Sequence, residues 1–256
     1  MLRELTIEGE IDKVKISLDR LKMYEPEEGY YLAYSGGKDS TVILDLAKKA
    51  GVKYDAWYNH TTVDPPELVR FIKSHKEVNI DYPDITMWRL IEKQGVPPTR
   101  LMRYCCKDLK ERGGEGRRVI TGVRWEESTK RQNRRSVERC FQGYDKLYVN
   151  PIIDWTSEDV WQYIRENNLE YCHLYDEGYT RLGCVMCPFS GKQGMIKDSK
   201  RWPKYYQAYI RAFDRMIKRR KEKGLKCDGW ETAEKVMYWW VHQPKKGNPD
   251  QTVLFE

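Results

Sequence analysis

The succession of apolar and amphipathic segments in this chain predicts an α/β fold built on a doubly wound, mostly parallel sheet. Short strands rich in aromatic or β-branched residues are expected at 29–34, 54–59, near 78–82, 119–123 and 147–153. Helical spacing of apolar residues accompanies them, at 11–24, 41–49, 65–75 and 87–94. Because strands and helices alternate along the chain, a parallel sheet with crossover helices is the expected arrangement.

Local signals support these elements in chain order. The first helix spaces Ile11, Val14, Leu18 and Leu21 at helical intervals, which indicates an amphipathic segment ahead of the first strand. The helix at 65–75 opens on a pair of prolines, which suit a first helical turn because the missing N–H would have no partner there.

The composition of the chain changes in its second half. A Thr156-Ser157-Glu158-Asp159 sequence caps a helix that extends to about Glu166. A cysteine loop follows, and then helices near 200–222 and 230–241 that are rich in Trp, Tyr and basic residues. The sequence therefore predicts an α/β domain at 1–190, with a helical lobe at 191–256 packed on it.

Composition excludes several classes of protein. The 256 residues are 40% hydrophobic and 33% charged, an ordinary globular balance that does not suit a disordered chain. Apolar runs are too short to cross a membrane, and the first residues lack a signal-peptide core, so a cytoplasmic protein is expected. The net charge of +7, concentrated at 100–139 and 197–226, suits either a polyanionic ligand or a solvated surface.

The segment Ser35-Gly36-Gly37-Lys38-Asp39-Ser40 predicts a phosphate-binding loop between a strand and a helix. Two glycines allow a tight turn that brings N–H groups close to an anion, and the helix N-terminus adds its dipole. Lys38 supplies a mobile positive charge, and the hydroxyls of Ser35 and Ser40 can contact phosphate oxygens. Asp39 suits a role in holding Mg²⁺ or in fixing the loop. The spacing differs from that of a Walker A loop.

This loop resembles the PP-loop of the N-type ATP pyrophosphatases, and the chain resembles their phosphoadenosine phosphosulfate (PAPS) reductase-like branch. Four further segments carry the likeness in the order in which that family has them: His60–Glu67, Thr121–Ser128, Pro151–Trp155 with Asp159-Val160-Trp161, and Gly183–Cys187. The likeness covers about residues 25–190.

The resemblance implies an adenine nucleotide α-hydrolase-like, Rossmann-like fold with the adenine over the carboxyl ends of the strands, at the topological switch point. It implies close backbone approach at Gly122, and it directs Arg124 and Arg131 toward phosphate or sulfate oxygens. A salt bridge of Arg124 with a neighbouring glutamate is the alternative. The basic residues at 130–135 are expected in a loop that orders around a ligand or that only improves solubility.

Four of the seven cysteines form a pattern, Cys105-Cys106 followed by Cys184-x-x-Cys187. An odd cysteine count argues against a disulfide framework and points to metal instead. The pattern resembles that of the APS-reductase branch, which implies a [4Fe–4S] cluster; zinc or uncoordinated thiols are the alternatives. The remaining three, Cys140, Cys172 and Cys227, are interpreted as small buried residues.

Two features depart from the reductases that the chain resembles. Residues 247–256 hold no cysteine of the kind those enzymes use as a nucleophile, and the Lys38-Asp39 pair that suits Mg·ATP is intact. We therefore expect an ATP pyrophosphatase that attacks the α-phosphate, releases pyrophosphate and activates an acceptor for sulfur transfer. Lys38, Asp39 and Arg124 are the expected catalytic residues.

Several partners and alternatives follow from this prediction. A sulfur donor resembling a cysteine desulfurase and a nucleic-acid acceptor are expected, as in DNA phosphorothioation. Aromatic residues of the C-terminal lobe either stack on a single strand or form the core of the lobe. A PAPS or APS reductase with Cys227 as nucleophile is one alternative function, and a non-catalytic nucleotide or nucleic-acid binding module is another.

Overall fold

A computed structural model describes residues 2–6, 9–140 and 145–242. Its contacts divide the chain into two compact units. The first consists of Met1–His60, Pro66–Tyr82 and Arg112–Gly183, and the second of Thr61–Pro65, Pro83–Glu111 and Cys184–Glu256. The predicted division into a domain at 1–190 and a lobe at 191–256 is a statement about which parts of the chain fold together. It stays a prediction.

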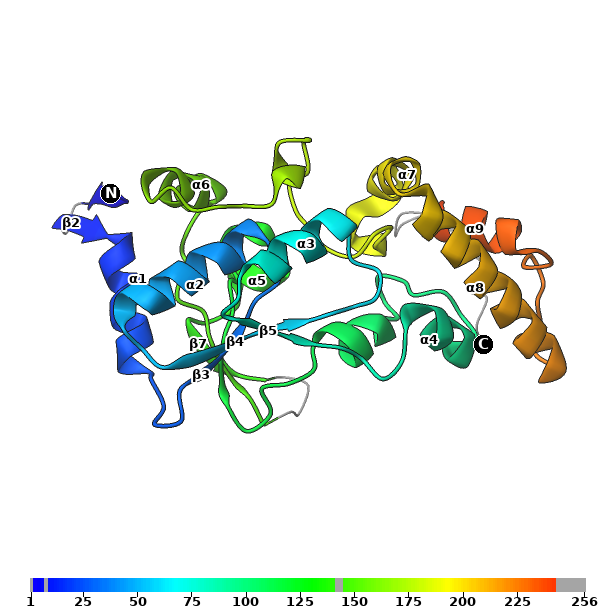
Figure 1. The fold of residues 1–256 in the computed structure, drawn as a ribbon, viewed down its shortest axis with the longest axis horizontal. Coiled ribbons are helices and arrows are strands. Elements are labelled where there is room, and N and C mark those ends of the chain that lie inside the picture. The colour runs from blue at the N-terminus through cyan, green and yellow to red at the C-terminus, as the bar shows by residue number, and fades with distance from the viewer. Residues whose placement is uncertain (1, 7–8, 141–144, 243–256) are drawn as a thin grey trace. The chain divides into compact units, whose positions relative to one another are not determined.

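The first unit contains a six-stranded sheet with the strand order β5-β4-β3-β6-β8-β7 (Figure 1). The strands are β3 (Tyr30–Ala33), β4 (Tyr54–Asn59), β5 (Val78–Asp81), β6 (Arg118–Ile120), β7 (Val137–Arg139) and β8 (Leu147–Val149). Every pairing is parallel except that of β7 with β8. The strand order reverses between β3 and β6, so the predicted doubly wound, mostly parallel sheet is confirmed.

The core of this sheet follows from its register. Leu32 in β3 pairs with Ala56 in β4 on one side and with Ile120 in β6 on the other, and all three are buried. Apolar side chains with little exposure on either face are what a central parallel strand requires.

Helices cover the sheet of the first unit. They are α1 (Lys13–Met23), α2 (Lys38–Ala50), α3 (Pro66–Ser74), α5 (Thr129–Gln132) and α6 (Ser157–Glu166). α2 contacts both α1 and α6 (Figure 1). The predicted cap of α6 is present, because Thr156 Oγ1 accepts from the Asp159 amide while Asp159 accepts from the Thr156 amide.

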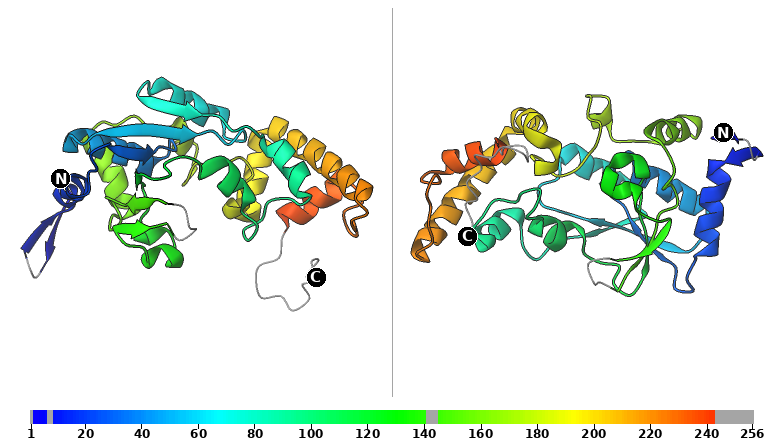
Figure 2. Two further views of the ribbon diagram at one scale, coloured as in Figure 1. Left: turned by 90° about the horizontal axis from the view of Figure 1, so that it is seen from below. Right: turned by 180° about the vertical axis from the view of Figure 1, so that it is seen from behind.

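Several expected boundaries need correction. α2 begins at Lys38 instead of residue 41, so the basic and acidic residues of the phosphate loop form its first turn. β6 and β8 end at residues 120 and 149, earlier than expected. The sequence analysis also missed β7 and the hairpin of β1 (Arg3–Thr6) with β2 (Gly9–Asp12), which extends away from α1 (Figure 2). These strands are too short and polar to show a period-two pattern.

The second unit is helical. It contains α4 (Met87–Gln94), α7 (Gly191–Arg201), α8 (Pro203–Glu222) and α9 (Ala233–Val241), and α8 contacts the other three. An aromatic cluster forms its core: the Trp240 ring lies 4.7 Å from Tyr209 and 5.4 Å from Phe213, and its indole N–H donates to Pro98 O.

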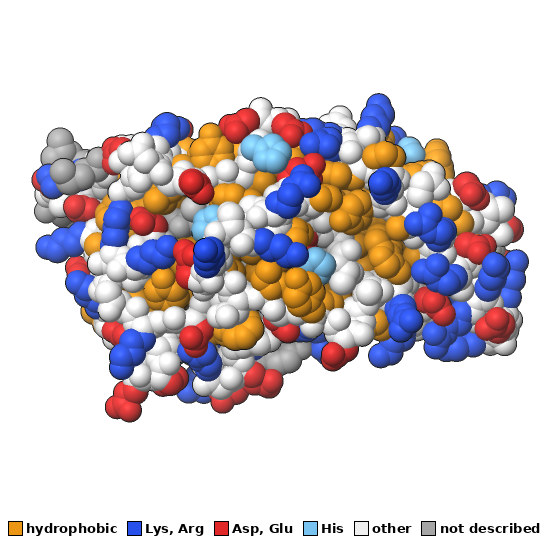
Figure 3. All heavy atoms as spheres, in the orientation of Figure 1, with side chains coloured by type: hydrophobic (Ala, Val, Ile, Leu, Met, Phe, Trp, Pro, Cys, Tyr) orange, Lys and Arg blue, Asp and Glu red, His pale blue; other side chains and the backbone are white. Residues whose placement is uncertain are grey.

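The degree of burial distinguishes core from surface among the aromatic side chains of the C-terminal lobe. Trp202, Trp230 and Trp240 are buried, which favours the core interpretation, whereas Tyr238 is 66% exposed. Basic side chains gather at the end of the second unit that holds the last turn of α8, with Arg219, Arg220 and Lys221 (Figure 3). Across 2–6, 9–140 and 145–242, no helix combines the length and apolar character that crossing a membrane requires.

Candidate functional site

The phosphate-binding loop lies where β3 passes into α2, at the carboxyl end of a central strand. Gly36 has a φ of +70°, and a Cβ there would come within 2.6–2.9 Å of Leu68 and Ile72 of α3. Both the backbone conformation and the space therefore require glycine at this position. The chain passes tightly over α3 and enters α2 with Gly37 as its extended N-cap residue.

Unpaired backbone amides make this turn suitable for an anion. Gly37 offers no side-chain cap, and the Lys38 amide donates to the hydroxyl of Tyr175 at 2.9 Å. Among the residues that the structure describes, no acceptor meets the amides of Gly36, Gly37, Asp39 or Ser40. Such N–H groups at a helix N-terminus, with the helix dipole behind them, bind phosphate oxygens.

A network of ion pairs joins the first turn of α2 to the segment after β6. Lys38 Nζ is 3.0 Å from Asp39 Oδ2, and Asp39 Oδ1 accepts from Arg124 Nε at 2.7 Å. Arg124 is 2% exposed, and it also donates to Glu126 at 2.8 Å and to the Ser157 hydroxyl at 3.2 Å. Burial lowers the pKa of Arg124, but the charge and hydrogen bond of Asp39 outweigh it, so the pKa is raised and the guanidinium stays charged.

Both oxygens of Asp39 are therefore engaged by cations. This favours the expected role of Asp39 in fixing the loop, since a metal ion would have to displace one of the two ion pairs. Arg124 bridges the first turn of α2 to the segment after β6, and its guanidinium is buried in its salt bridge with Glu126 instead of lying on the surface. Its predicted contact with a ligand phosphate stays a prediction.

The other predicted site residues lie around this core with one exception. A Cβ on Gly122 would lie only 3.0–3.2 Å from Asp39, so the close approach at Gly122 is to the start of α2. The Ser40 hydroxyl donates to Gly37 O at 2.8 Å and lies 3.2 Å from the Ser35 hydroxyl. Arg131 is the exception, because it is half-buried in α5 and ion-paired with Glu127.

The basic segment at 130–135 differs from the expected loop. Residues 129–132 form a helical turn, and Arg134 pairs with Glu138 while its guanidinium lies over the Tyr148 ring at 5.6 Å. Ion pairs three or four residues apart favour this local structure.

Tyr175 is a member of the site that the sequence analysis missed. It comes from the short helical segment His173–Tyr175, and its ring packs edge-on against Trp161 at 5.0 Å. Burial raises the pKa of its hydroxyl above the ordinary value, so the phenol stays protonated. No motif surrounds Tyr175, and its 137-residue separation from Lys38 left no local signal.

The four patterned cysteines all belong to the second unit. Cys105 and Cys106 lie at the start of a short helical segment whose π-helical turn is Cys106–Lys110, and Cys184 and Cys187 flank a tight turn in which the Cys187 amide donates to Cys184 O. All four are free and partly buried. The pKa of Cys105 is raised by its hydrogen bond with Cys106, by burial, and by the charges of Cys106, Cys184 and Cys187.

These four thiols thus lie within electrostatic reach of one another. Thiolates are the ligands that iron–sulfur clusters and zinc prefer, so the donor set fits either group. Over the described part of the chain, however, no three His, Cys, Asp or Glu side chains are arranged to hold a single metal ion.

The loop between Cys184 and Cys187 is held by backbone contacts. The Val185 amide donates to Val63 O and the Met186 amide to Asp198 Oδ2, both at 2.8 Å. Met186 has a φ of +58°, an uncommon conformation for a side chain with a Cβ. These contacts hold the backbone of the turn between the two cysteines.

The other cysteines correct one expectation. Cys172 is buried, as predicted, whereas Cys140 and Cys227 are only half-buried. The Cys227 thiol lies 3.6 Å from Leu225 O.

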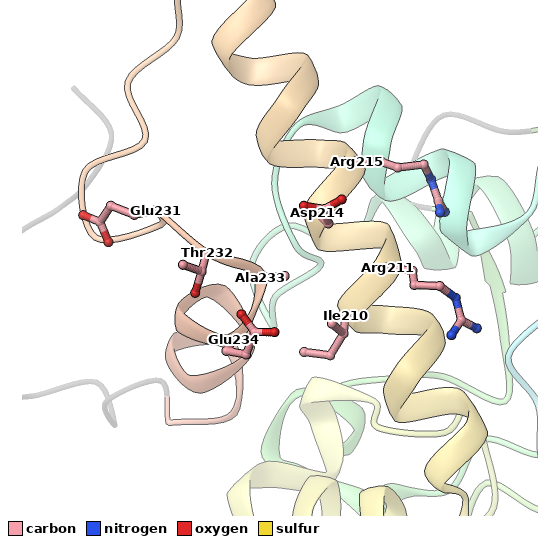
Figure 4. A pocket seen from close by; sticks show the side chains of 8 residues that line it. All are labelled: Ile210, Arg211, Asp214, Arg215, Glu231, Thr232, Ala233 and Glu234. Carbon is pink, nitrogen blue, oxygen red and sulfur yellow. The ribbon is translucent and has the colours of Figure 1, made fainter.

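A separate hollow of about 540 Å³ lies in the second unit (Figure 4). It is lined by α8, by residues 231–232 and by the start of α9, and contains none of the predicted site residues. Three of its charged side chains are paired: Asp214 with Lys218, Glu231 with Lys235, and Arg215 with Glu92.

Comparison with known proteins agrees with this geometry. An α/β sheet that presents a helix N-terminus at its switch point defines a nucleotide-binding class. Residues 29–190 match the family model of the phosphoadenosine phosphosulfate reductase domain. The chain belongs to this family.

Relatives with sequence similarity include both uncharacterised proteins and named reductases. An uncharacterised protein of Methanocaldococcus jannaschii is 30% identical over 70% of the chain and 46% of its own length. An adenosine 5'-phosphosulfate reductase of Oceanobacillus iheyensis is 28% identical over 66% of the chain and 75% of its own length. The chain thus spans about half the length of the first of these relatives.

One solved structure supports the fold. The PAPS reductase of Candida auris, solved as a phosphate complex, covers 68% of the chain and 88% of its own length, with a TM-score of 0.51 and 21% identity. At this identity the likeness concerns the fold alone.

Proposed function

We propose that this chain binds ATP through residues 35–40 and directs an acceptor oxygen to the α-phosphorus. The acceptor oxygen forms a bond to phosphorus, the bond to the bridging oxygen breaks, and pyrophosphate leaves with the electron pair. An acceptor hydroxyl loses its proton to solvent, whereas a phosphodiester oxygen has no proton to lose. Sulfur at the oxidation level of sulfide then attacks the adenylylated acceptor, and AMP leaves with the electron pair as the bond to sulfur forms. The products from ATP are AMP and pyrophosphate.

The observation that carries this proposal is the combination of unpaired amides with a lysine–aspartate pair at the start of α2. The amides offer donors to several phosphate oxygens, and Lys38 can leave Asp39 for a ligand that carries more negative charge. Charge accumulates on the leaving pyrophosphate, so donors placed there stabilise the transition state. A ligand without a triphosphate would make less use of this pair.

Two groups would serve this chemistry. Mg²⁺ would neutralise charge on the triphosphate, and Asp39 would hold it only through the oxygen that Lys38 vacates when it turns to the phosphates. A [4Fe–4S] cluster would be held by Cys105, Cys106, Cys184 and Cys187. We further propose a cysteine desulfurase-like protein as sulfur donor.

Sulfonucleotide reduction is the second candidate, because relatives of the chain are named adenosine 5'-phosphosulfate reductases. It requires a nucleophilic thiol, and Cys227 is the candidate that we name outside the patterned set.

Positional isotope exchange, measured in the presence of a single-stranded nucleic acid as the acceptor expected from the sequence, distinguishes the two functions. ATP labelled with ¹⁸O in the α–β bridge is incubated with the full chain and Mg²⁺, and the label is followed by ³¹P NMR. Migration of the label, or formation of AMP and pyrophosphate, supports the proposal, and Lys38→Ala should abolish it. Formation of ADP and phosphate contradicts it. Release of sulfite from a sulfonucleotide and a thiol, abolished in Cys227→Ser, would establish the reductase instead.

A further inference from the structure

Trp125 presents an exposed aromatic ring one residue after the buried Arg124. The side chain is 40% exposed, among the few large apolar side chains that the structure leaves open to solvent. Exposure of an apolar ring to water is unfavourable, and aromatic rings in this position commonly serve recognition.

The ring is held firmly in spite of its exposure. The Trp125 backbone amide donates to Ile153 O at 2.8 Å, and the indole N–H donates to Arg134 O, also at 2.8 Å. Because both ends are fixed, a ligand that stacks on the ring causes little further loss of side-chain entropy on binding. A ring that only filled space at the surface would not need a partner for its N–H.

The segment that carries this ring is basic. Residues 124–139 carry six basic side chains (Arg124, Lys130, Arg131, Arg134, Arg135, Arg139) and three acidic ones (Glu126, Glu127, Glu138), a balance of +3. Arg124, Arg131 and Arg134 are ion-paired. Lys130 and Arg135 are exposed, and the described residues provide no carboxylate partner for either side chain. Exposed cations in the same segment as an aromatic face suit a polyanion with bases.

We propose that Trp125, with Lys130 and Arg135, forms a stacking site for a base of a single-stranded nucleic acid. Arg124 connects this site to the phosphate loop through its 2.7 Å bond to Asp39. The bound strand is then the acceptor whose backbone is presented to the activated phosphate. This inference rests on the proposed function for the identity of the acceptor, but strand binding itself requires no turnover.

Binding of a fluorescein-labelled 12-nucleotide single strand to the full chain, followed by anisotropy, tests the site. Trp125→Ala should weaken binding about 5- to 150-fold, the usual effect of losing one stacked base, while Trp125→Phe keeps most of the affinity. A Lys130→Gln, Arg135→Gln double variant should reduce the slope of log K against log salt by about 0.7 for each phosphate that is no longer neutralised. Tyr238→Ala, which removes an exposed ring of α9, is the matched control and should bind normally.

Several results would overturn the proposal. If Trp125→Ala binds the strand as tightly as the unchanged chain does, Trp125 is not a stacking site. If only Tyr238→Ala loses affinity for the strand, the stacking site lies on α9. Weaker ATP binding by Trp125→Ala without a change for the strand assigns the ring to the nucleotide. If Trp125→Ala changes the sedimentation coefficient of the chain, the Trp125 ring belongs to a contact between copies of the chain. Since strand binding is measured without ATP, failure of pyrophosphate release alone would contradict the proposed function and not this site.

Discussion

Asp39 and Arg124 are 85 residues apart in the chain, yet Asp39 Oδ1 accepts a hydrogen bond from Arg124 Nε at 2.7 Å. The pair joins the first turn of α2, which follows β3, to the segment that follows β6. β3 and β6 are the two adjacent strands at which the sheet order reverses. The ion pair therefore fixes the two loops that enclose the switch point, where nucleotides bind in this class of fold.

Replacement of Arg124 by alanine should destabilise the first unit. Asp39 would lose one cation and Glu126 its buried partner, so we expect the free energy of unfolding to fall by about 2–4 kcal/mol. Urea denaturation followed by circular dichroism measures this. The matched control is Arg165→Ala, whose pair with Glu158 is exposed and should contribute less than about 1 kcal/mol. Equal losses in both variants would contradict a special role for the buried pair.

Local sequence signals predicted the sheet and the turn from β3 into α2 well. β4 and α4 lie where their patterns place them, since an aromatic strand of six residues and an apolar stripe of eight leave few alternatives. Contacts between distant segments were not predictable in the same way. The hydrogen bond of Tyr175 to Lys38 and the grouping of 83–111 with the C-terminal helices depend on tertiary packing, for which a single sequence carries no periodic signal.

Gly36→Ala should destabilise the chain by about 2–4 kcal/mol and abolish ATP binding. The new methyl group would meet Leu68 and Ile72 below 3.0 Å, in addition to the cost of a positive φ. Gly51→Ala is a close control, because Gly51 has nearly the same φ, +71°, but nothing within 4 Å of its added Cβ. It should cost only about 1 kcal/mol. Thermal unfolding and calorimetric titration with ATP compare the two, and similar penalties would argue against the close approach to α3.

Lys38→Ala should weaken the binding of ATP far more than the binding of AMP. Removal of a charge-assisted hydrogen bond to the outer phosphates corresponds to about a 10- to 100-fold rise in the Kd of ATP, whereas AMP lacks those phosphates. Calorimetric titration of both nucleotides gives the ratio. Lys48→Ala removes an exposed lysine from the same helix and should change neither affinity. An equal loss for ATP and AMP would assign Lys38 to the α-phosphate or to the structure of the loop.

The four patterned cysteines should determine the iron content. Anaerobic purification is expected to yield a brown protein with about four irons per chain, because four thiolates are the usual ligands of a [4Fe–4S] cluster. Cys184→Ala should lose the visible absorption of the cluster and most of the iron. Cys140→Ala, outside the pattern, should retain both. A colourless protein that contains zinc would contradict the cluster and support the alternative metal.

Asp159 should make the stability of the first unit depend on acid pH. Burial raises the pKa of its carboxyl, but hydrogen bonds from Lys13 at 2.7 Å and from the Thr156 amide outweigh this, so the pKa is lowered in the folded state. The stabilisation is therefore complete above the ordinary pKa of an aspartate, about 4, and is lost as the pH falls through that value toward the folded one. Asp159→Asn should cost about 1–3 kcal/mol at pH 7 and progressively less below pH 4.

Urea denaturation at pH 7, 5 and 3.5 measures this convergence of the variant with the unchanged chain. Glu158→Gln is the neighbouring control, because Glu158 pairs with Arg165 on the surface and should have little effect at any of the three pH values. A difference between Asp159→Asn and the unchanged chain that stays constant down to pH 3.5 would show that the side chain acts through its shape and not through its charge.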